Sequence, residues 1–263
     1  MTTFDAERCR EALDTERYGR SLTALSATES TMDDARAAAE QGAPDGHVVV
    51  ADHQRNGRGS HGRAWSSPAG TDLYFSLVLR PTLTLSDLPP LTLAVGLAVA
   101  QTLEALLNGS SGQHRVHIKW PNDVFVDEKK CAGILVETRS IGTAPAAVIV
   151  GVGVNVNRLG FEPELASAST SLALALGAAY PREPLLAQLL GALERQVTRF
   201  SVSGPAAIAA DVDARLLHRG ETVRVDDVRG TLTGVSPEGA LCVTDERGVP
   251  RKLLSGRVVR TSG

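Results

Sequence analysis

Short apolar runs along this chain share β-branched and aromatic residues and are bounded by turn-forming residues, a pattern typical of buried β-strands. They occupy residues 48–52, 73–80, 115–120, 123–127, 131–138 and 146–156. Segments with helical periodicity lie around them, at residues 4–13, 32–42, 86–107, 184–200 and 205–217. The order of these elements predicts an α+β fold in which helices flank a central mixed sheet.

The segment at residues 86–107 is continuously apolar at first and amphipathic afterwards, as expected for a long helix packed against a sheet. We find no apolar stretch that approaches the roughly 20 residues needed to span a bilayer. We therefore expect a core helix and no membrane association. The N-terminal sequence lacks the charged-then-apolar order of a secretory signal, which predicts a cytoplasmic protein.

The composition changes near Arg219, after which short β-rich pieces alternate with Gly, Pro and Asp turns. This pattern predicts a small C-terminal β-barrel. We expect one large domain over residues 1–217, with its core at about 25–200, and one small domain over residues 218–263.

Composition narrows the classes of function. The chain has 263 residues, of which 43% are hydrophobic and 22% are charged, and its formal net charge is -3. Because the basic residues are not gathered in one block, a general nucleic-acid-binding role has little support. Cys9, Cys131 and Cys242 are far apart and lack CxxC spacing, so we expect buried or partly exposed thiols and neither a disulfide framework nor a zinc site.

A hydroxyl-rich segment at residues 26–31 precedes the helix predicted at 32–42. Ser30 or Thr31 is a candidate N-cap, because a hydroxyl there can accept a hydrogen bond from the first turn. The same helix N-terminus could offer its N–H groups to a polar or anionic ligand. Local sequence favours capping alone.

The segment GRGSHGRAW at residues 57–65 combines three glycines with Arg58, His61, Arg63 and a tryptophan. Flexible backbone beside cationic donors suits an anionic, phosphate-bearing ligand, although solvated surface turns have the same composition. Its place between two predicted core strands favours a functional loop, which we expect to be mobile.

The segment KWPNDV at residues 119–124 predicts a tight turn, and its polar side chains are compatible with a nucleotide site. Asn122 can donate and accept, and Asp123 can bind Mg²⁺ through oxygen. Lys130 is a candidate for neutralising a carboxylate and an α-phosphate together, with a solvated strand-end lysine as the commoner alternative. We favour Lys130 over Lys129 because Lys130 directly precedes the next apolar run.

The segment VGVGVNVN at residues 150–157 is not a Rossmann fingerprint, because no helix and no suitably placed acidic residue follow it. Gly151 and Gly153 could make space on a strand beside a flat ligand, with plain packing as a close alternative. The two tryptophans of the chain lie in the two preceding motifs, Trp65 in GRGSHGRAW and Trp120 in KWPNDV. We expect Trp65 at a ligand site and leave Trp120 open between core and pocket.

Motifs of nucleophilic hydrolysis, such as GxSxG and HExxH, are absent from the sequence, which favours positioning and charge neutralisation of an ATP-derived group. Together the motifs resemble the bacterial biotin protein ligase family. They run in order along the chain as ESTM, Gln54, GRGSHGRAW, LYFSLVLRP, KWPNDV, KKCAGILVE and GVGVNVN. The resemblance implies a catalytic domain like those of class II aminoacyl-tRNA synthetases and biotin ligases, with a Src-homology-3-like C-terminal barrel.

The resemblance also implies an activity and a site. The family joins biotin and ATP into biotinyl-AMP, releasing pyrophosphate, and then transfers biotin to a lysine of a biotin carboxyl carrier protein. Mg²⁺ accompanies ATP, with Asp123 as its ligand, and no tightly bound prosthetic group is implied. The implied catalytic residues are Lys130, Arg58 and Asp123. The implied biotin site is Ser30, Thr31, Gln54, Arg58, Gly59, Ser60, Lys130, Gly133 and Gly151. The implied nucleotide site is Arg63, Trp65, Asn122, Asp123, Asn155 and Arg260.

Two residues depart from the family pattern: Met32 stands where an asparagine is usual, and Ser60 where the loop usually has an arginine. Losing one guanidinium predicts weaker retention of the adenylate unless His61 or Arg63 substitutes. About 25 residues precede the hydroxyl-rich segment at residues 26–31, too few for a winged helix-turn-helix, so we expect a monofunctional ligase that does not bind nucleic acid.

Other functions stay open at this point. A lipoate or octanoyl ligase or transferase of the same fold is the nearest enzyme alternative, and a non-catalytic biotin-binding regulator is the alternative from another class. The expected partner is the carrier protein or domain of acetyl-CoA carboxylase. A homodimer is possible.

Overall fold

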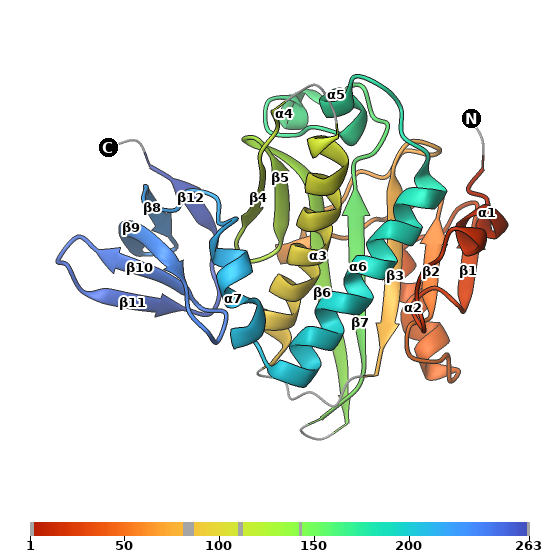
Figure 1. Ribbon diagram of the computed structural model, residues 1–263, viewed down its shortest axis with the longest axis horizontal. Helices are drawn as coiled ribbons and strands as arrows, with labels where there is room; N and C mark the ends of the chain where they lie inside the picture. Colours follow the sequence, from red (N-terminus) through yellow and green to blue (C-terminus); the bar gives the residue numbers. More distant parts are fainter. Residues whose placement is uncertain (1–2, 81–86, 110–112, 142–143, 262–263) are drawn as a thin grey trace.

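The computed structural model describes residues 3–80, 87–109, 113–141 and 144–261, and its main feature is a seven-stranded sheet (Figure 1). Some predicted positions lie outside this range. They are residue 81 of the motif LYFSLVLRP, residue 86 of the helix predicted at 86–107, and residues 262–263 of the predicted small domain. The strand order is β1 (Leu22–Leu25), β2 (Val48–Ala51), β3 (Leu73–Leu79), β7 (Ala144–Val154), β6 (Lys129–Ile141), β5 (Asp123–Val126) and β4 (Val116–Lys119).

The sheet is mixed, as predicted. The β1–β2 pair is parallel, and the β2–β3, β3–β7, β7–β6, β6–β5 and β5–β4 pairs are antiparallel. Every residue of β2 and β3 is buried, which explains their unbroken apolar sequences. The four residues of β1 have no such sequence signal, and the sequence analysis missed this strand.

Helices cover both faces of the sheet. On one face, α3 (Leu88–Asn108) and α6 (Arg182–Ser203) run side by side (Figure 1), and α3 packs on β4, β5 and β6. On the other, α2 (Thr31–Glu40) packs on β2, β3 and β7. The remaining helices are α1 (Ala6–Glu11), the 3₁₀ turn η1 (Ser60–Gly62), α4 (Pro163–Ala166), α5 (Leu172–Leu176) and α7 (Ala206–Asp213).

The expectation that no apolar stretch approaches membrane-spanning length is wrong for α3. This helix has 21 residues and is long and apolar enough, by length and composition, to cross a bilayer. Its scattered Thr, Gln and Glu residues interrupt the apolar run but leave the average hydropathy high. Because 72% of its most apolar window is buried inside the protein, α3 is a core helix, as its sequence pattern predicted.

The C-terminal part forms a separate antiparallel sheet, at one end of the molecule in Figure 1. Its order is β11 (Pro250–Leu253), β10 (Leu241–Asp245), β9 (Val228–Val235), β8 (Thr222–Val225) and β12 (Val258–Arg260). Among the described residues, the edge strands β11 and β12 do not pair with each other, so hydrogen bonds do not close the predicted barrel. The α+β fold class, with a mixed sheet, flanking helices and a small β unit, is confirmed.

Candidate active site

A cavity of about 610 Å³ lies between the loop at residues 57–65, the strands β5, β6 and β7, and the C-terminal sheet. This volume is typical of small-ligand sites. Every residue that the sequence analysis assigned to biotin, nucleotide or metal lines this cavity. Cationic side chains outnumber acidic ones in its lining, so an anionic ligand is favoured; the cationic ones are Arg58, Arg63, Lys119, Lys130, Arg158, Arg257 and Arg260.

The loop at residues 57–65 is a small hairpin closed by its own backbone. The Gly59 N–H donates to the Arg63 carbonyl at 2.7 Å, and the Trp65 N–H donates to the Gly57 carbonyl at 2.8 Å. His61 adopts left-handed backbone with φ 57°, and Gly62 follows with φ 70°. The Arg63 guanidinium donates to the hydroxyl of Ser60, the residue that departs from the family pattern, at 3.2 Å.

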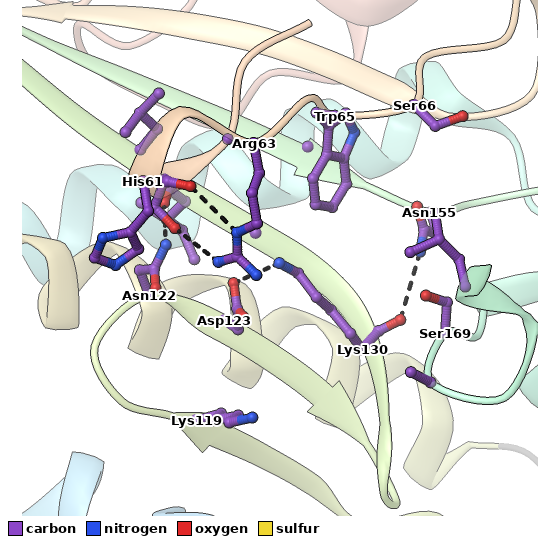
Figure 2. A pocket seen from close by; sticks show the side chains of 18 of the residues that line it. His61, Arg63, Trp65, Ser66, Lys119, Asn122, Asp123, Lys130, Asn155 and Ser169 are labelled. Atoms are coloured by element: carbon purple, nitrogen blue, oxygen red, sulfur yellow. Dashed lines mark hydrogen bonds and ion pairs between the residues drawn. The ribbon is translucent and has the colours of Figure 1, made fainter. Parts of the chain in front are cut away.

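Lys130 and Asp123 form an ion pair inside the cavity, with 2.6 Å between Nζ and Oδ1 (Figure 2). The pair arises because β5 and β6 are antiparallel neighbours that carry these residues near their ends. The ammonium also lies 5.1 Å from the centre of the Trp65 ring. This is a partly buried cation, 26% exposed, which can exchange a carboxylate for the oxyanions of a ligand.

Trp65 packs against the glycines of β6 and β7. A Cβ atom added to Gly133 would lie 2.8 Å from its ring, and one added to Gly153 would lie 2.5 Å away. A Cβ atom at Gly151 would lie 2.4 Å from Sδ of Met32. The space above Gly151 and Gly153 is therefore filled by side chains of this chain, which supports the packing alternative over a flat ligand lying directly on the strand.

The end of the cavity beneath α2 is polar. The Thr31 N–H and hydroxyl both donate to Gln54 Oε1, at 2.9 and 3.1 Å, and the Ser76 hydroxyl donates to Thr31 Oγ1 at 2.9 Å. Ser30 occupies the N-cap position but makes no side-chain capping bond, and its buried hydroxyl has no partner in the described part of the chain. The interpretation of this segment as a cap alone is therefore wrong, and the Ser30 hydroxyl is free for a ligand.

Asn122 and Asn155 use their amides to hold backbone at the cavity wall. The Asn122 amide donates to the Ile134 carbonyl, and the Asn155 amide donates to the Thr170 carbonyl, both at 2.9 Å. Trp120 is 3% exposed and donates to the Gly239 carbonyl at 3.2 Å, so it serves the core, while its edge also lines the cavity. Arg260 lies 2.7 Å from Glu221.

Asp33, Glu137 and Lys119 contact this site without a role in the sequence analysis. Arg58 lies 2.9 Å from Asp33 and 3.6 Å from Glu137, carboxylates on α2 and β6. Lys119 faces the cavity in Figure 2, and burial lowers its pKa, an effect that nearby Asp123 opposes. Lys119 is the first residue of the KWPNDV motif, and this position is the sequence signal that could have identified it as a site residue.

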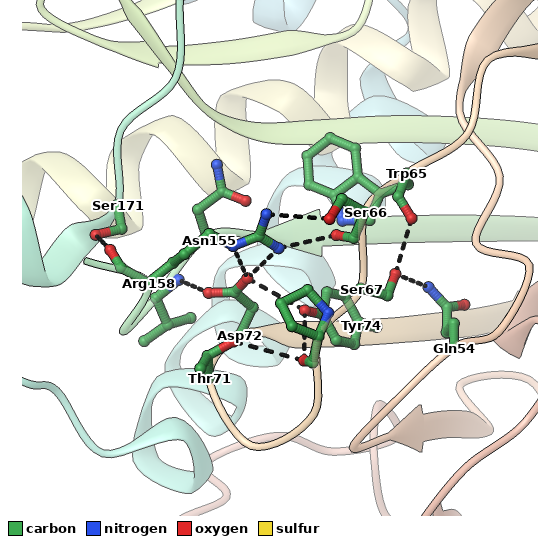
Figure 3. Close-up of polar contacts among 12 residues, drawn as sticks. Gln54, Trp65, Ser66, Ser67, Thr71, Asp72, Tyr74, Asn155, Arg158 and Ser171 are labelled. Atoms are coloured by element: carbon green, nitrogen blue, oxygen red, sulfur yellow. Dashed lines mark hydrogen bonds and ion pairs between the residues drawn. The ribbon is translucent and has the colours of Figure 1, made fainter. Parts of the chain in front are cut away.

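A buried ion pair secures the wall behind Trp65. Arg158 Nη2 lies 2.7 Å from Asp72 Oδ2 and donates to the Ser66 carbonyl at 2.9 Å (Figure 3). The Asp72 carboxylate is fully buried and also accepts from the Val156 N–H at 2.8 Å. Because these partners are far apart in sequence, no local pattern predicts them.

The fold and the cavity define a class of α+β proteins. Their pocket has a cationic lining, glycines on the strands that form its wall, and a polar end, which together favour an anionic ligand with a polar group. Residues 25–155 match the model of the biotin/lipoate A/B protein ligase family. The bifunctional ligase/repressor BirA of Bacillus subtilis is 33% identical over 95% of this chain and 77% of that protein. The biotin–[acetyl-CoA-carboxylase] ligase of Mycobacterium tuberculosis is 36% identical over 85% and 83%, respectively.

Solved structures agree with these relatives. The biotin protein ligase of Aquifex aeolicus in complex with biotin and ATP superimposes with a TM-score of 0.80 at 30% identity, over 92% of this chain and 100% of that one. The Leishmania major biotin protein ligase in complex with biotinyl-5-AMP gives 0.61 at 26% identity, over 89% and 98%. The chain belongs to the biotin/lipoate A/B protein ligase family.

Proposed function

We propose that this chain is an ATP-dependent biotin protein ligase, with biotin and ATP as substrates and no tightly bound prosthetic group. The observation that carries the proposal is the Lys130–Asp123 pair under Trp65, in a cavity whose opposite end is polar. Relatives named as biotin ligases and a neighbour bound to biotin and ATP support it.

The polar end of the cavity suits the ring of biotin. A ureido group offers one carbonyl acceptor and two N–H donors, and the Ser30 hydroxyl and the Gln54 amide supply the complementary groups there. A saturated acyl chain would leave the buried Ser30 hydroxyl without a partner, which disfavours octanoyl and lipoyl substrates at this site. The biotin carboxylate would then point toward Lys130.

The first reaction is then a displacement at phosphorus. A biotin carboxylate oxygen attacks the α-phosphorus of ATP, a new O–P bond forms, and the bond to pyrophosphate breaks. The chain holds both anions in line and offsets their repulsion with Lys130, Arg58 and Arg63. The loop at residues 57–65 would cover the mixed anhydride and keep water from it.

Magnesium would enter with ATP. Among the described residues, no group of three or more His, Cys, Asp or Glu side chains is placed to hold a metal ion. Asp123 is a carboxylate in the cavity, and one carboxylate plus substrate phosphates and water is a usual setting for Mg²⁺. Asp123 would hold the ion there, and Mg²⁺ would neutralise charge on the leaving pyrophosphate.

The second reaction transfers biotin to a lysine of a biotin carboxyl carrier protein of acetyl-CoA carboxylase. The neutral lysine amine attacks the carbonyl carbon of biotinyl-AMP, an amide forms, and AMP leaves. We further propose that residues 1–217 are the catalytic domain and residues 218–263 the small domain, in a cytoplasmic protein that does not bind nucleic acid and can form homodimers.

The test is biotin-dependent exchange between ATP and labelled pyrophosphate, with lipoate and octanoate as competing acids. Of the three acids, we expect only biotin to support exchange. Titration calorimetry is likewise expected to give tight binding for biotin only. Exchange with lipoate or octanoate would favour the other branch of the family. Biotin binding without exchange would indicate a non-catalytic biotin-binding regulator.

A further inference from the structure

A directed chain of hydrogen bonds connects the polar end of the cavity to Trp65. The Ser76 hydroxyl donates to Thr31 at 2.9 Å, and the Thr31 hydroxyl donates to Gln54 Oε1 at 3.1 Å. On the other side of the same amide, Gln54 Nε2 donates to Ser67 Oγ at 3.0 Å, and the Ser67 hydroxyl donates to the Trp65 carbonyl at 3.0 Å (Figure 3).

Ser67 stands where both ends of the loop at residues 57–65 meet. A Cβ atom at Gly57 would lie 2.7 Å from Ser67 Oγ, 3.0 Å from Gln54 Nε2 and 2.5 Å from the Trp65 carbonyl oxygen. Ser67 is 6% exposed and Gln54 is 8% exposed, so neither bond is weakened by competing water. Gln54, Ser67 and the two ends of the loop therefore form one closely packed, hydrogen-bonded contact.

Ser66, the residue between Trp65 and Ser67, is held by a different part of the protein. Arg158, held by buried Asp72, donates to the Ser66 carbonyl at 2.9 Å. The backbone that follows Trp65 is thus held at two points, by Arg158 at the Ser66 carbonyl and by Ser67 at the Trp65 carbonyl. The Trp65 ring in turn packs on Gly153 and lies 5.1 Å from the Lys130 ammonium.

We propose that Ser67 is a positioning residue that couples ligand binding at Gln54 to the placement of Trp65 beside Lys130. The inference rests on the proposed function, which makes biotin the ligand at Gln54. Biotin bound at the polar end would fix the Gln54 amide, and Ser67 would pass this constraint to Trp65. The nucleotide end of the cavity would then be arranged before ATP reacts.

The two tryptophans of the chain allow a direct test. In a Trp120→Phe background, Trp65 is the sole tryptophan, and its fluorescence reports its surroundings. We expect biotin to change this emission. In the same background, Ser67→Ala is expected to bind biotin within about tenfold of the parent by calorimetry, since the two hydrogen bonds that it loses are neutral ones, yet to lose most of the Trp65 response.

Ser236→Ala is the matched control, because Ser236 is another buried serine, 4% exposed, in the turn before β10 and away from the cavity. It is expected to keep the full Trp65 response. Ser67→Cys keeps an atom at the γ position, a somewhat larger one, with a much weaker hydrogen-bonding group, and it replaces Ser67→Ala if that variant melts early.

A full Trp65 response in the folded Ser67 variants would overturn the proposal. So would a parent protein that binds biotin by calorimetry without any change in Trp65 emission. Absence of biotin binding to the parent would instead contradict the proposed function, and the coupling with it, so the two failures are distinguishable.

Discussion

The indole ring of Trp65 packs directly against the backbone of Gly153, so closely that a Cβ atom on this glycine would lie 2.5 Å from the ring. The strand β7 thus carries a glycine at the point where the tryptophan of the loop enters the cavity. In this position the ring also faces Lys130, at 5.1 Å from its ammonium. Trp65 thus connects the loop at residues 57–65 with strand β7 and with the Lys130–Asp123 ion pair.

Gly153→Ala is therefore expected to displace Trp65 from its place beside Lys130. We predict that kcat/KM for biotin-dependent pyrophosphate exchange falls at least about tenfold, because the reacting groups are no longer held in line. Gly160→Ala, a glycine with open space around its Cβ position, is the control and is expected to stay within about twofold. Equal activities for the two variants would contradict this role of Gly153.

Ser60→Arg restores the guanidinium that the family usually has in the loop. A charge-assisted contact to the adenylate is expected to slow the dissociation of biotinyl-AMP by about tenfold. Rapid dilution of the preformed complex measures this rate. Thr231→Arg adds the same charge on the exposed face of β9 and should leave the rate unaltered. An unchanged rate in Ser60→Arg would contradict the prediction that Ser60 weakens retention of the adenylate.

Lys119 is predicted to give ATP binding an alkaline limit. Burial favours the neutral amine and lowers its pKa below the usual 10.5, so Lys119 loses its proton at a lower pH than an ordinary lysine. If its charge helps to bind ATP, the KM for ATP rises as pH increases toward that lowered pKa. Lys119→Arg keeps the charge, so we predict a KM for ATP that stays flat over the same range. Parallel pH profiles of the two proteins would argue against this role.

The buried ion pair of Asp72 and Arg158 is predicted to stabilise the folded protein strongly. Asp72→Asn keeps the size of the side chain but removes the buried counter-charge of Arg158 and leaves only the exposed Glu162, 3.7 Å away, at a cost of about 3 kcal/mol in the free energy of unfolding. Asp211→Asn breaks the exposed pair with Arg199 and should cost under about 1 kcal/mol. Urea denaturation measures both. Similar losses for the two variants would contradict the assignment.

The sequence predicted much of this site because its motifs lie where strands end. GRGSHGRAW follows β2, KWPNDV connects β4 to β5, and Lys130 is the second residue of β6, so residues of one motif come to face those of another across the cavity. Strand-like composition and helical periodicity were sufficient for the central sheet and its long covering helices. The assigned roles of the individual residues stay predictions.

Other features depend on contacts between distant segments. Asp72 and Arg158 are 86 positions apart, and Ser67 meets Gln54 across a loop, so neither relationship has a periodic or compositional signature. Short elements were missed for a related reason: β1 has four residues and α4 has four, too few to show a period. The filling of the space above Gly151 by Met32 likewise follows from packing alone.

The central claim is that Lys130 neutralises charge while biotin is joined to the α-phosphate of ATP. Biotin-dependent pyrophosphate exchange by Lys130→Ala, beside Lys129→Ala, tests it most directly, because the neighbouring lysine is exposed and does not line the cavity. We predict a loss of about 10²–10³-fold for Lys130→Ala and near-normal exchange for Lys129→Ala. Normal exchange by folded Lys130→Ala, or an equal loss in both variants, would contradict the account.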